Sequence, residues 1–253
     1  PDAWRRGGGP SGGAAMFAEV NKPVSVKDLL SGALVVSGND AAITLAEGIA
    51  GSEPVFATLM NAEAKRIGMT HTVFRNATGF SDPAQVSTAR DLGLLGQAVI
   101  RDFPDYYPIF AEPGITWNKI HQRNRNPLLD TTLGVDGLQV GWIKDGGYHA
   151  LASAKLKNQR LVAVTLGAKS EKERLEETKR LLDWGFQAFK PHELFAAGKE
   201  IARARVFGGT HGSVGLVAHG PVHVLASRVP GEQISAKVSY RGPLRAPVAN
   251  DTE

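Results

Sequence analysis

Cysteine is absent from the 253-residue sequence. Its absence excludes disulfides, thiol nucleophiles and thiolate metal sites together. The seven histidines are scattered along the chain and show no metal-ligand spacing, so no metal is expected. The sequence implies no organic cofactor either. No apolar run approaches the roughly 20 residues that a membrane-spanning helix requires, and no transmembrane helix is predicted.

Charge of one sign is not concentrated anywhere in the chain. The 29 Lys and Arg residues and 25 Asp and Glu residues give a net charge of +4. The basic residues form no block with interleaved aromatic residues, so no nucleic-acid partner is expected. A content of 42% hydrophobic and 21% charged residues is typical of a globular protein that can bury a core.

Residues 1–14 (PDAWRRGGGPSGGA) are rich in Gly and Pro and are predicted to be a flexible leader. Apolar residues at helical spacing follow. They predict helices over residues 25–36, 41–50, about 51–66 and from residue 87 onward. Ser25 is the expected N-cap of the first helix. The third helix is expected to bury one face, formed by Val55, Phe56, Leu59 and Met60.

The second half of the chain predicts strands. VDGLQVGWIKDGGYHALASA (residues 135–154) contains two apolar runs separated by a Gly-containing turn, and residues 160–166 provide a third strand. A strongly amphipathic helix follows over residues 173–189. A helix packed on an antiparallel sheet is an α+β arrangement, and this domain is expected to span residues 15–191.

Residues 192–253 are predicted to form a separate, small all-β domain of the β-sandwich type. Short alternating runs separated by Gly and Pro support this prediction. One of them, QISAKVSYRG, places Ile234, Ala236, Val238 and Tyr240 on one face of an expected strand.

Three polar segments are candidates for chemistry, and each has a simpler structural interpretation. In SGND, Ser37 and Asn39 could relay a proton and hold a substrate amide, or the segment could merely turn the chain and cap a helix. Arg125 in HQRNRNPLL could bind a carboxylate with its guanidinium fork, or be a solvated loop residue. GLQVG could pair its backbone with an extended substrate, or be a core strand with a bulge.

In this order and with these flanks, the segments resemble those of the serine-type D-alanyl-D-alanine carboxypeptidases. These low-molecular-weight penicillin-binding proteins form peptidase family S11. The resemblance covers about residues 16–190, and SYRGPLRAPVA resembles the small β domain of the same family. It is carried by the segments VKDLLSGALVVSGNDAAITLAEGIAGSE, NAEAKRIGMTHTVFRNATGF, STARDLGLLGQAVIRDFPDYY, TWNKIHQRNRNPLL, VDGLQVGWIKDGGYHALASA and LGAKSEKERLEETKRLLDWGF.

The resemblance implies a β-lactamase/transpeptidase-like domain and an acyl-enzyme mechanism. A serine in S-x-x-K is acylated by the terminal D-Ala-D-Ala of a peptidoglycan stem peptide. Ser37-Gly38-Asn39 matches the S-x-N motif, which makes Ser37 and Asn39 the implied catalytic residues. The family's K-T-G motif binds the substrate carboxylate from the sheet edge, and Gln139-Val140-Gly141 occupies its place. Arg125 matches a family arginine near that carboxylate.

Two departures from the family pattern matter. No serine in the chain is followed by lysine three residues later, so the resemblance implies that the nucleophile precedes Pro1. In the third motif, Gln139 lacks the positive charge of lysine and Val140 lacks the hydroxyl of threonine. Each lost charged hydrogen bond is expected to cost roughly 1.5–3 kcal/mol.

Three functions therefore stay open at this point. The first is a periplasmic carboxypeptidase that trims peptidoglycan in cell-wall remodelling and is acylated by β-lactams. The alternative is a catalytically degenerate homologue that binds peptidoglycan or a partner. A third option is a purely structural role for the β domain. In this family a C-terminal amphipathic helix often anchors the protein to the membrane. Membrane association is therefore expected only through a segment that this sequence, which ends in APVANDTE, does not contain.

Overall fold

The computed structural model describes residues 2–229 and 234–250. The chain divides into two compact units, Pro1–Trp184 and Gly185–Glu253. The first strand of the second unit begins at Phe189, slightly before the boundary at residue 192 that the sequence predicts.

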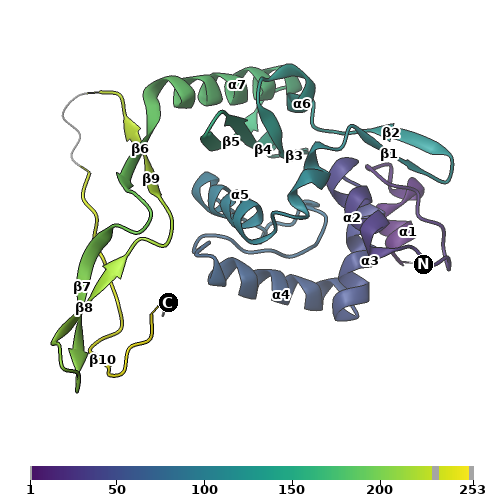
Figure 1. The fold of residues 1–253 in the computed structure, drawn as a ribbon. Helices are drawn as coiled ribbons and strands as arrows, with labels where there is room; N and C mark the ends of the chain where they lie inside the picture. The colour runs from purple at the N-terminus through teal and green to yellow at the C-terminus, as the bar shows by residue number, and fades with distance from the viewer. Residues whose placement is uncertain (1, 230–233, 251–253) are drawn as a thin grey trace. The chain divides into compact units, whose positions relative to one another are not determined.

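The first unit combines helices with a three-stranded sheet (Figure 1). In chain order its elements are α1 (Asp2–Gly7), η1 (Gly9–Ser11), α2 (Val26–Val35), α3 (Asn39–Ala50), α4 (Glu53–Arg66), α5 (Ala89–Asp102), η2 (Tyr107–Ala111), β1 (Gly114–Trp117), β2 (Ile120–Arg123), α6 (Leu128–Thr131), β3 (Val135–Ile143), β4 (Gly147–Leu156), β5 (Gln159–Ala168) and most of α7 (Glu171–Ala188), whose last turn crosses the boundary between the units.

The predicted α+β arrangement is confirmed. Strands β3, β4 and β5 form an antiparallel sheet in sequence order. Figure 1 shows α7 above this sheet and α5 below it. On the α7 side, the hydroxyls of Thr165 and Thr178 lie 2.7 Å apart. On the α5 side, Gly96 lets the helix approach closely, because a Cβ there would lie 3.1 Å from the side chains of both Leu138 and Leu151.

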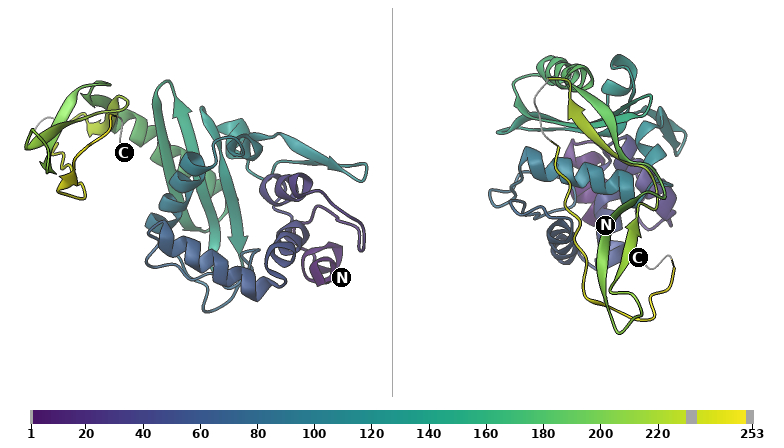
Figure 2. Two further views of the ribbon diagram at one scale, coloured as in Figure 1. Left: turned by 60° about the horizontal axis from the view of Figure 1, so that its bottom comes forward. Right: turned by 60° about the vertical axis from the view of Figure 1, so that its left-hand side comes forward.

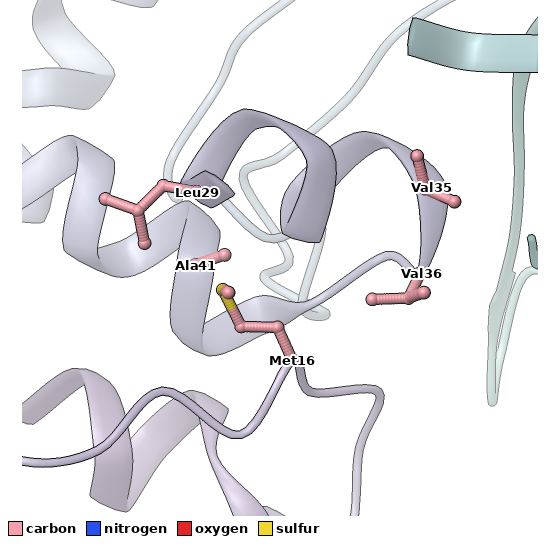
Figure 3. Packing of buried hydrophobic residues seen from close by; sticks show 5 residues of the cluster. All are labelled: Met16, Leu29, Val35, Val36 and Ala41. Atoms are coloured by element: carbon pink, nitrogen blue, oxygen red, sulfur yellow. The ribbon is translucent and has the colours of Figure 1, made fainter. Parts of the chain in front are cut away.

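A second core holds the N-terminal helices together. Met16, Leu29, Val35, Val36 and Ala41 are buried and pack as one cluster between α2 and α3 (Figure 3). The expected N-cap of α2 is confirmed, because the Ser25 hydroxyl accepts a hydrogen bond from the backbone N–H of Asp28. The segment before α2 and the β1–β2 hairpin extend side by side (Figure 2, left), and the Gln122 amide donates to the carbonyl of Ala15.

The prediction of a flexible leader over residues 1–14 is wrong for the described residues 2–11, which form α1 and η1. Two contacts order this segment. The Arg6 guanidinium forms an ion pair with the buried carboxylate of Glu53 at 2.5 Å. Gly7 lies directly on α3, where a Cβ would come within 2.5 Å of the Asp40 nitrogen. Glycine, which suggested flexibility, serves here for close packing.

The buried face predicted for α4 is also partly wrong. Val55 and Leu59 are 52% and 48% exposed. The helix instead buries the small residues Ala57 and Ala64, which allow closer packing than branched side chains.

The second unit is all-β, as predicted. Its strands are β6 (Phe189–Phe195), β7 (Glu200–Phe207), β8 (Ser213–Val217), β9 (Val222–Ser227) and β10 (Leu244–Arg245). Strands β6 and β9 pair with each other, and β7 lies between β8 and β10.

The strand predicted from QISAKVSYRG is not formed in its described part, because residues 234–240 have no regular secondary structure. Ile234, Val238 and Tyr240 are each at least 40% exposed. The alternation of apolar and polar residues is therefore not matched by a buried face in this segment. Gln233, the first residue of this stretch, lies outside the described residues.

No helix among the described residues combines the length and apolarity needed to cross a bilayer.

Candidate active site

The three candidate segments meet at the C-terminal end of helix α2. The last four carbonyls of an α-helix have no partner within the helix. In α2 the first of them, on Gly32, accepts the backbone N–H of Gly38, and the last, on Val35, accepts the backbone N–H of Arg125, both at 2.9 Å. SGND and HQRNRNPLL are thereby held at the same helix end.

The side chain of Gln139 satisfies the two remaining carbonyls. Its Nε2 donates to the carbonyl of Leu34 at 2.8 Å and to that of Ala33 at 3.3 Å. The hydroxyl of Ser37 donates to Oε1 of Gln139 at 3.4 Å. The third-motif strand β3 is therefore bonded to α2 and to the S-x-N serine by one side chain.

The SGND turn is compressed between α2 and α3. Ser37 adopts a left-handed conformation, with φ of 54°. A Cβ on Gly38 would lie 2.9 Å from the carbonyl oxygen of Gly32 and from the nitrogen of Met16, so only glycine fits this position without rearrangement. Asn39 is the first residue of α3, and its backbone N–H donates to the carbonyl of Ala14.

Asp40 has a larger role than the helix cap that the sequence suggests. Its carboxylate is buried and accepts the backbone N–H groups of Met16 and Ala18, each at 2.9 Å. The segment preceding α2 is therefore fastened to the SGND turn. No local pattern indicates these partners, because they lie more than 20 residues upstream.

Strand β3 presents a free edge at this site. Among the described strands it pairs with β4 alone, so backbone groups on its other side are available for pairing with an extended peptide. Gly141 is exposed and Val140 is partly buried.

Arg174 of α7 lies beside Gly141 and was not singled out from the sequence. Its Nη1 is 3.5 Å from the carbonyl oxygen of Gly141, and its guanidinium lies 5.7 Å from the centre of the Tyr148 ring. Its side chain is 5% exposed and is paired with the exposed carboxylate of Glu171. Burial lowers the pKa of Arg174, against the opposing effect of Glu171. A charged residue on an amphipathic helix gives no sequence signal that it faces a strand.

The structure brings together Ser37, Gly38 and Gln139, whereas the other candidates lie nearby without direct side-chain contacts among them. The guanidinium of Arg125 is exposed and makes no hydrogen bond or ion pair with the described residues. Within residues 2–229 and 234–250, no group of three or more His, Asp or Glu side chains could hold a metal ion. The site thus offers neutral polar groups, an open strand edge and one buried cation.

Comparison with known proteins identifies the two parts of the chain. Residues 1–170 match the D-alanyl-D-alanine carboxypeptidase family, Peptidase S11. Residues 189–253 match the C-terminal domain of penicillin-binding protein 5.

Similar proteins include D-alanyl-D-alanine carboxypeptidase DacA of Haemophilus influenzae, which is 45% identical over 205 residues, or 80% of this chain and 52% of that protein. The chain therefore spans about half the length of this curated relative. The crystal structure of penicillin binding protein 5 from Haemophilus influenzae superposes with a TM-score of 0.82 at 40% identity and covers 98% of this chain and 72% of that one.

Penicillin-binding protein D2 from Listeria monocytogenes, in its ampicillin-bound form, has a TM-score of 0.63 at 32% identity. The match covers 69% of this chain and 73% of the Listeria chain. The family match over residues 1–170, the β domain that follows and the motif junction at α2 agree with one another. The chain belongs to the D-alanyl-D-alanine carboxypeptidase family, Peptidase S11.

Proposed function

We propose that the protein containing this chain is a serine-type D-Ala-D-Ala carboxypeptidase that removes the terminal D-alanine from peptidoglycan stem peptides. This chain would supply two walls of the active site, the S-x-N turn and the third-motif strand. The observation that carries the proposal is the hydrogen bonding of Gln139, which joins strand β3 to the end of α2 and to Ser37. Such a junction is what a cleft between these two motifs requires.

The free edge of β3 is the proposed binding surface for the peptide. Main-chain hydrogen bonds along a sheet edge supply affinity for an extended segment. Asn39, at the start of α3, would hold a peptide amide, since its side chain offers both a donor and an acceptor.

Arg174 is the proposed partner of the substrate carboxylate. Its Nη1 lies 3.5 Å from the carbonyl oxygen of Gly141 on this strand, and a guanidinium matches a carboxylate geometrically. It would compensate for the charge that Gln139 lacks. Arg125 stays a second candidate for this role.

We further propose that the protein binds β-lactams and acts in the bacterial cell envelope, in the periplasm. The ampicillin-bound form of the Listeria relative supports the first point, and the family's D-alanyl-D-alanine carboxypeptidase activity supports the second. The comparisons lend no support to the degenerate alternative.

Intact-mass spectrometry of the full-length gene product, with and without ampicillin, tests the reaction. One added mass of ampicillin is expected, because the family reaction forms an acyl-enzyme on a serine. A folded protein that shows no adduct would favour the degenerate binding module.

The carboxylate site is tested separately by titrating a D-Ala-D-Ala peptide into an Arg174→Gln variant. Binding should weaken by about 10-fold or more, as expected for the loss of a charged hydrogen-bond partner. Arg180→Gln is the matched control, because Arg180 lies on the same helix but is exposed and paired with Glu177. Equal weakening by both variants would argue against a specific role for Arg174.

A further inference from the structure

We infer that Gln139 acts as a positioning residue for Ser37 and does not itself bind substrate. Its side-chain amide makes the Ser37 hydroxyl a donor toward strand β3, so that Ser37 offers only acceptor lone pairs to a bound molecule. The catalytic consequence rests on the proposed function, whereas the hydrogen-bond arrangement does not.

The orientation of the Gln139 amide follows from its partners. The carbonyls of Ala33 and Leu34 can only accept hydrogen bonds, so the side-chain atom facing them at 3.3 and 2.8 Å must be Nε2. The opposite atom is then Oε1, which carries no proton. Because Ser37 Oγ lies 3.4 Å from Oε1, the Ser37 hydroxyl must be the donor of that bond.

A lysine at this position would reverse the direction of the bond. An ammonium group has three donors and no acceptor. It could donate to the same helix carbonyls and to Ser37 Oγ, which would leave the Ser37 proton free to point at a bound molecule. A single residue on β3 therefore decides whether Ser37 can give a proton to the cleft.

The difference matters for proton transfer. A hydroxyl relays a proton by accepting one at Oγ and passing its own proton onward. Here the Ser37 proton points to an amide oxygen, which is far too weak a base to take it. In this chain the relay ends at Gln139, and Ser37 can bind an N–H donor of the ligand, such as a peptide amide or an ammonium group. The proton that leaves with D-alanine must then come from another group.

The position of Gln139 at a helix C-terminus provides a test that does not depend on activity. The carbonyl end of a helix carries partial negative charge, which favours donors and cations and disfavours carboxylates. A glutamate of the same shape as Gln139 would lose both donated hydrogen bonds and add a repelled charge. Lysine would keep donors at this place.

The first experiment compares the thermal stability of Gln139→Glu and Gln139→Lys with the wild-type chain. At pH 7, Gln139→Glu is expected to lower Tm by about 5 °C or more and Gln139→Lys by less than about 2 °C. A carboxyl group at a helix C-terminus has its folded-state pKa raised, so the stability deficit of Gln139→Glu should shrink as the pH falls from 7 to 4.

Gln187→Glu is the matched control, because Gln187 is exposed near the C-terminal end of α7 (Glu171–Ala188). It introduces the same charge near a helix end without removing the bonds to α2, and its Tm should change by less than about 1 °C. Equal Tm losses for both glutamate variants would overturn the assignment of Gln139 as the cap of α2.

The second experiment tests the direction of the Ser37 bond with a double-mutant cycle of ampicillin acylation in the full-length protein. Ser37→Ala should slow acylation by less than about 3-fold in the wild-type background and by more than about 30-fold in the Gln139→Lys background. The same factor in both backgrounds would overturn the inference.

Complete absence of acylation would count against the proposed function, and stability would then decide the inference alone. Ser37→Ala should lower Tm when Gln139 is present and leave it unchanged in the Gln139→Leu background, which has no acceptor for the hydroxyl. A Tm loss of equal size in both backgrounds would show that Ser37 does not depend on Gln139.

Discussion

Replacing Asp136 with alanine should destabilise the first unit more than any exposed substitution, because Asp136 organises a network across the whole sheet. Both its carboxylate oxygens bind the guanidinium of Arg160, at 2.7 and 2.8 Å. The hydroxyl of Tyr107 donates to the same carboxylate at 2.7 Å, and Arg160 also donates to Ser153. One network thus joins β3, β4, β5 and η2.

The expected cost follows from these contacts. Asp136→Ala removes three hydrogen bonds to a charged group, each worth about 1.5–3 kcal/mol when buried. The Arg160 and Asp136 side chains are 27% and 31% exposed, so water replaces part of what is lost. Because Arg160 keeps Ser153 as a partner, we expect a net loss of about 3 kcal/mol in the free energy of unfolding.

Urea denaturation at pH 7 and a thermal melt provide the measurement, and a loss of this size corresponds to a Tm decrease of about 6–12 °C. Asp130→Ala serves as the control, because Asp130 is exposed on α6 and should change stability by less than about 0.5 kcal/mol. A double mutant with Arg160→Met should show coupling of at least about 1 kcal/mol. The reasoning would be refuted by additive effects or by an Asp136→Ala loss as small as that of the control.

Two further predictions concern a partly buried histidine and a buried carboxylate. His149 Nδ1 accepts the backbone N–H of Gly167 at 3.1 Å. Partial burial, and secondly repulsion from Arg174, lower the pKa of His149. The folded protein therefore favours the neutral imidazole, and the free energy of unfolding should fall as the pH drops below about 6.5. His149→Asn keeps an acceptor that does not titrate, so its Tm relative to wild type should rise between pH 7.5 and 5.5, and a constant difference would contradict the assignment. Asp40→Ala leaves the buried N–H of Met16 unpaired and should cost about 2–4 kcal/mol in urea denaturation, whereas full stability of that variant would mean that the segment before α2 is held by other contacts.

The strands of the sheet and the helix that follows them could be predicted from the sequence, because the spacing of apolar residues and the turn residues that determine them lie within a few positions of one another. The strands over residues 135–154 and 160–166 and the helix after them appear as β3, β4, β5 and α7. The failures occurred where packing partners are distant. Residues 2–7 became helical through Arg6 and Gly7, and Val55 stayed exposed because α4 packs through alanines.

The candidate site shows the same division. SGND and Gln139-Val140-Gly141 could be recognised as motifs with altered chemistry, since residue type alone shows that an amide has replaced a cation. Their partners could not be recognised. The role of Asp40 depends on backbone groups far upstream, and Arg174 reaches Gly141 from a helix that follows two strands later.

The sequence by itself determined the family, the three strands and following helix that form β3, β4, β5 and α7, and the absence of a lysine from the third motif. Each of these depends on residue identity and on the spacing of apolar residues over a few positions. Only the tertiary structure decided what Gln139 does. Every α-helix leaves its last four carbonyls without a partner inside the helix. Which donor binds those of α2 depends on how strand β3 packs against this helix. Hydrogen bonds between segments more than 100 positions apart depend on that packing and on no local rule.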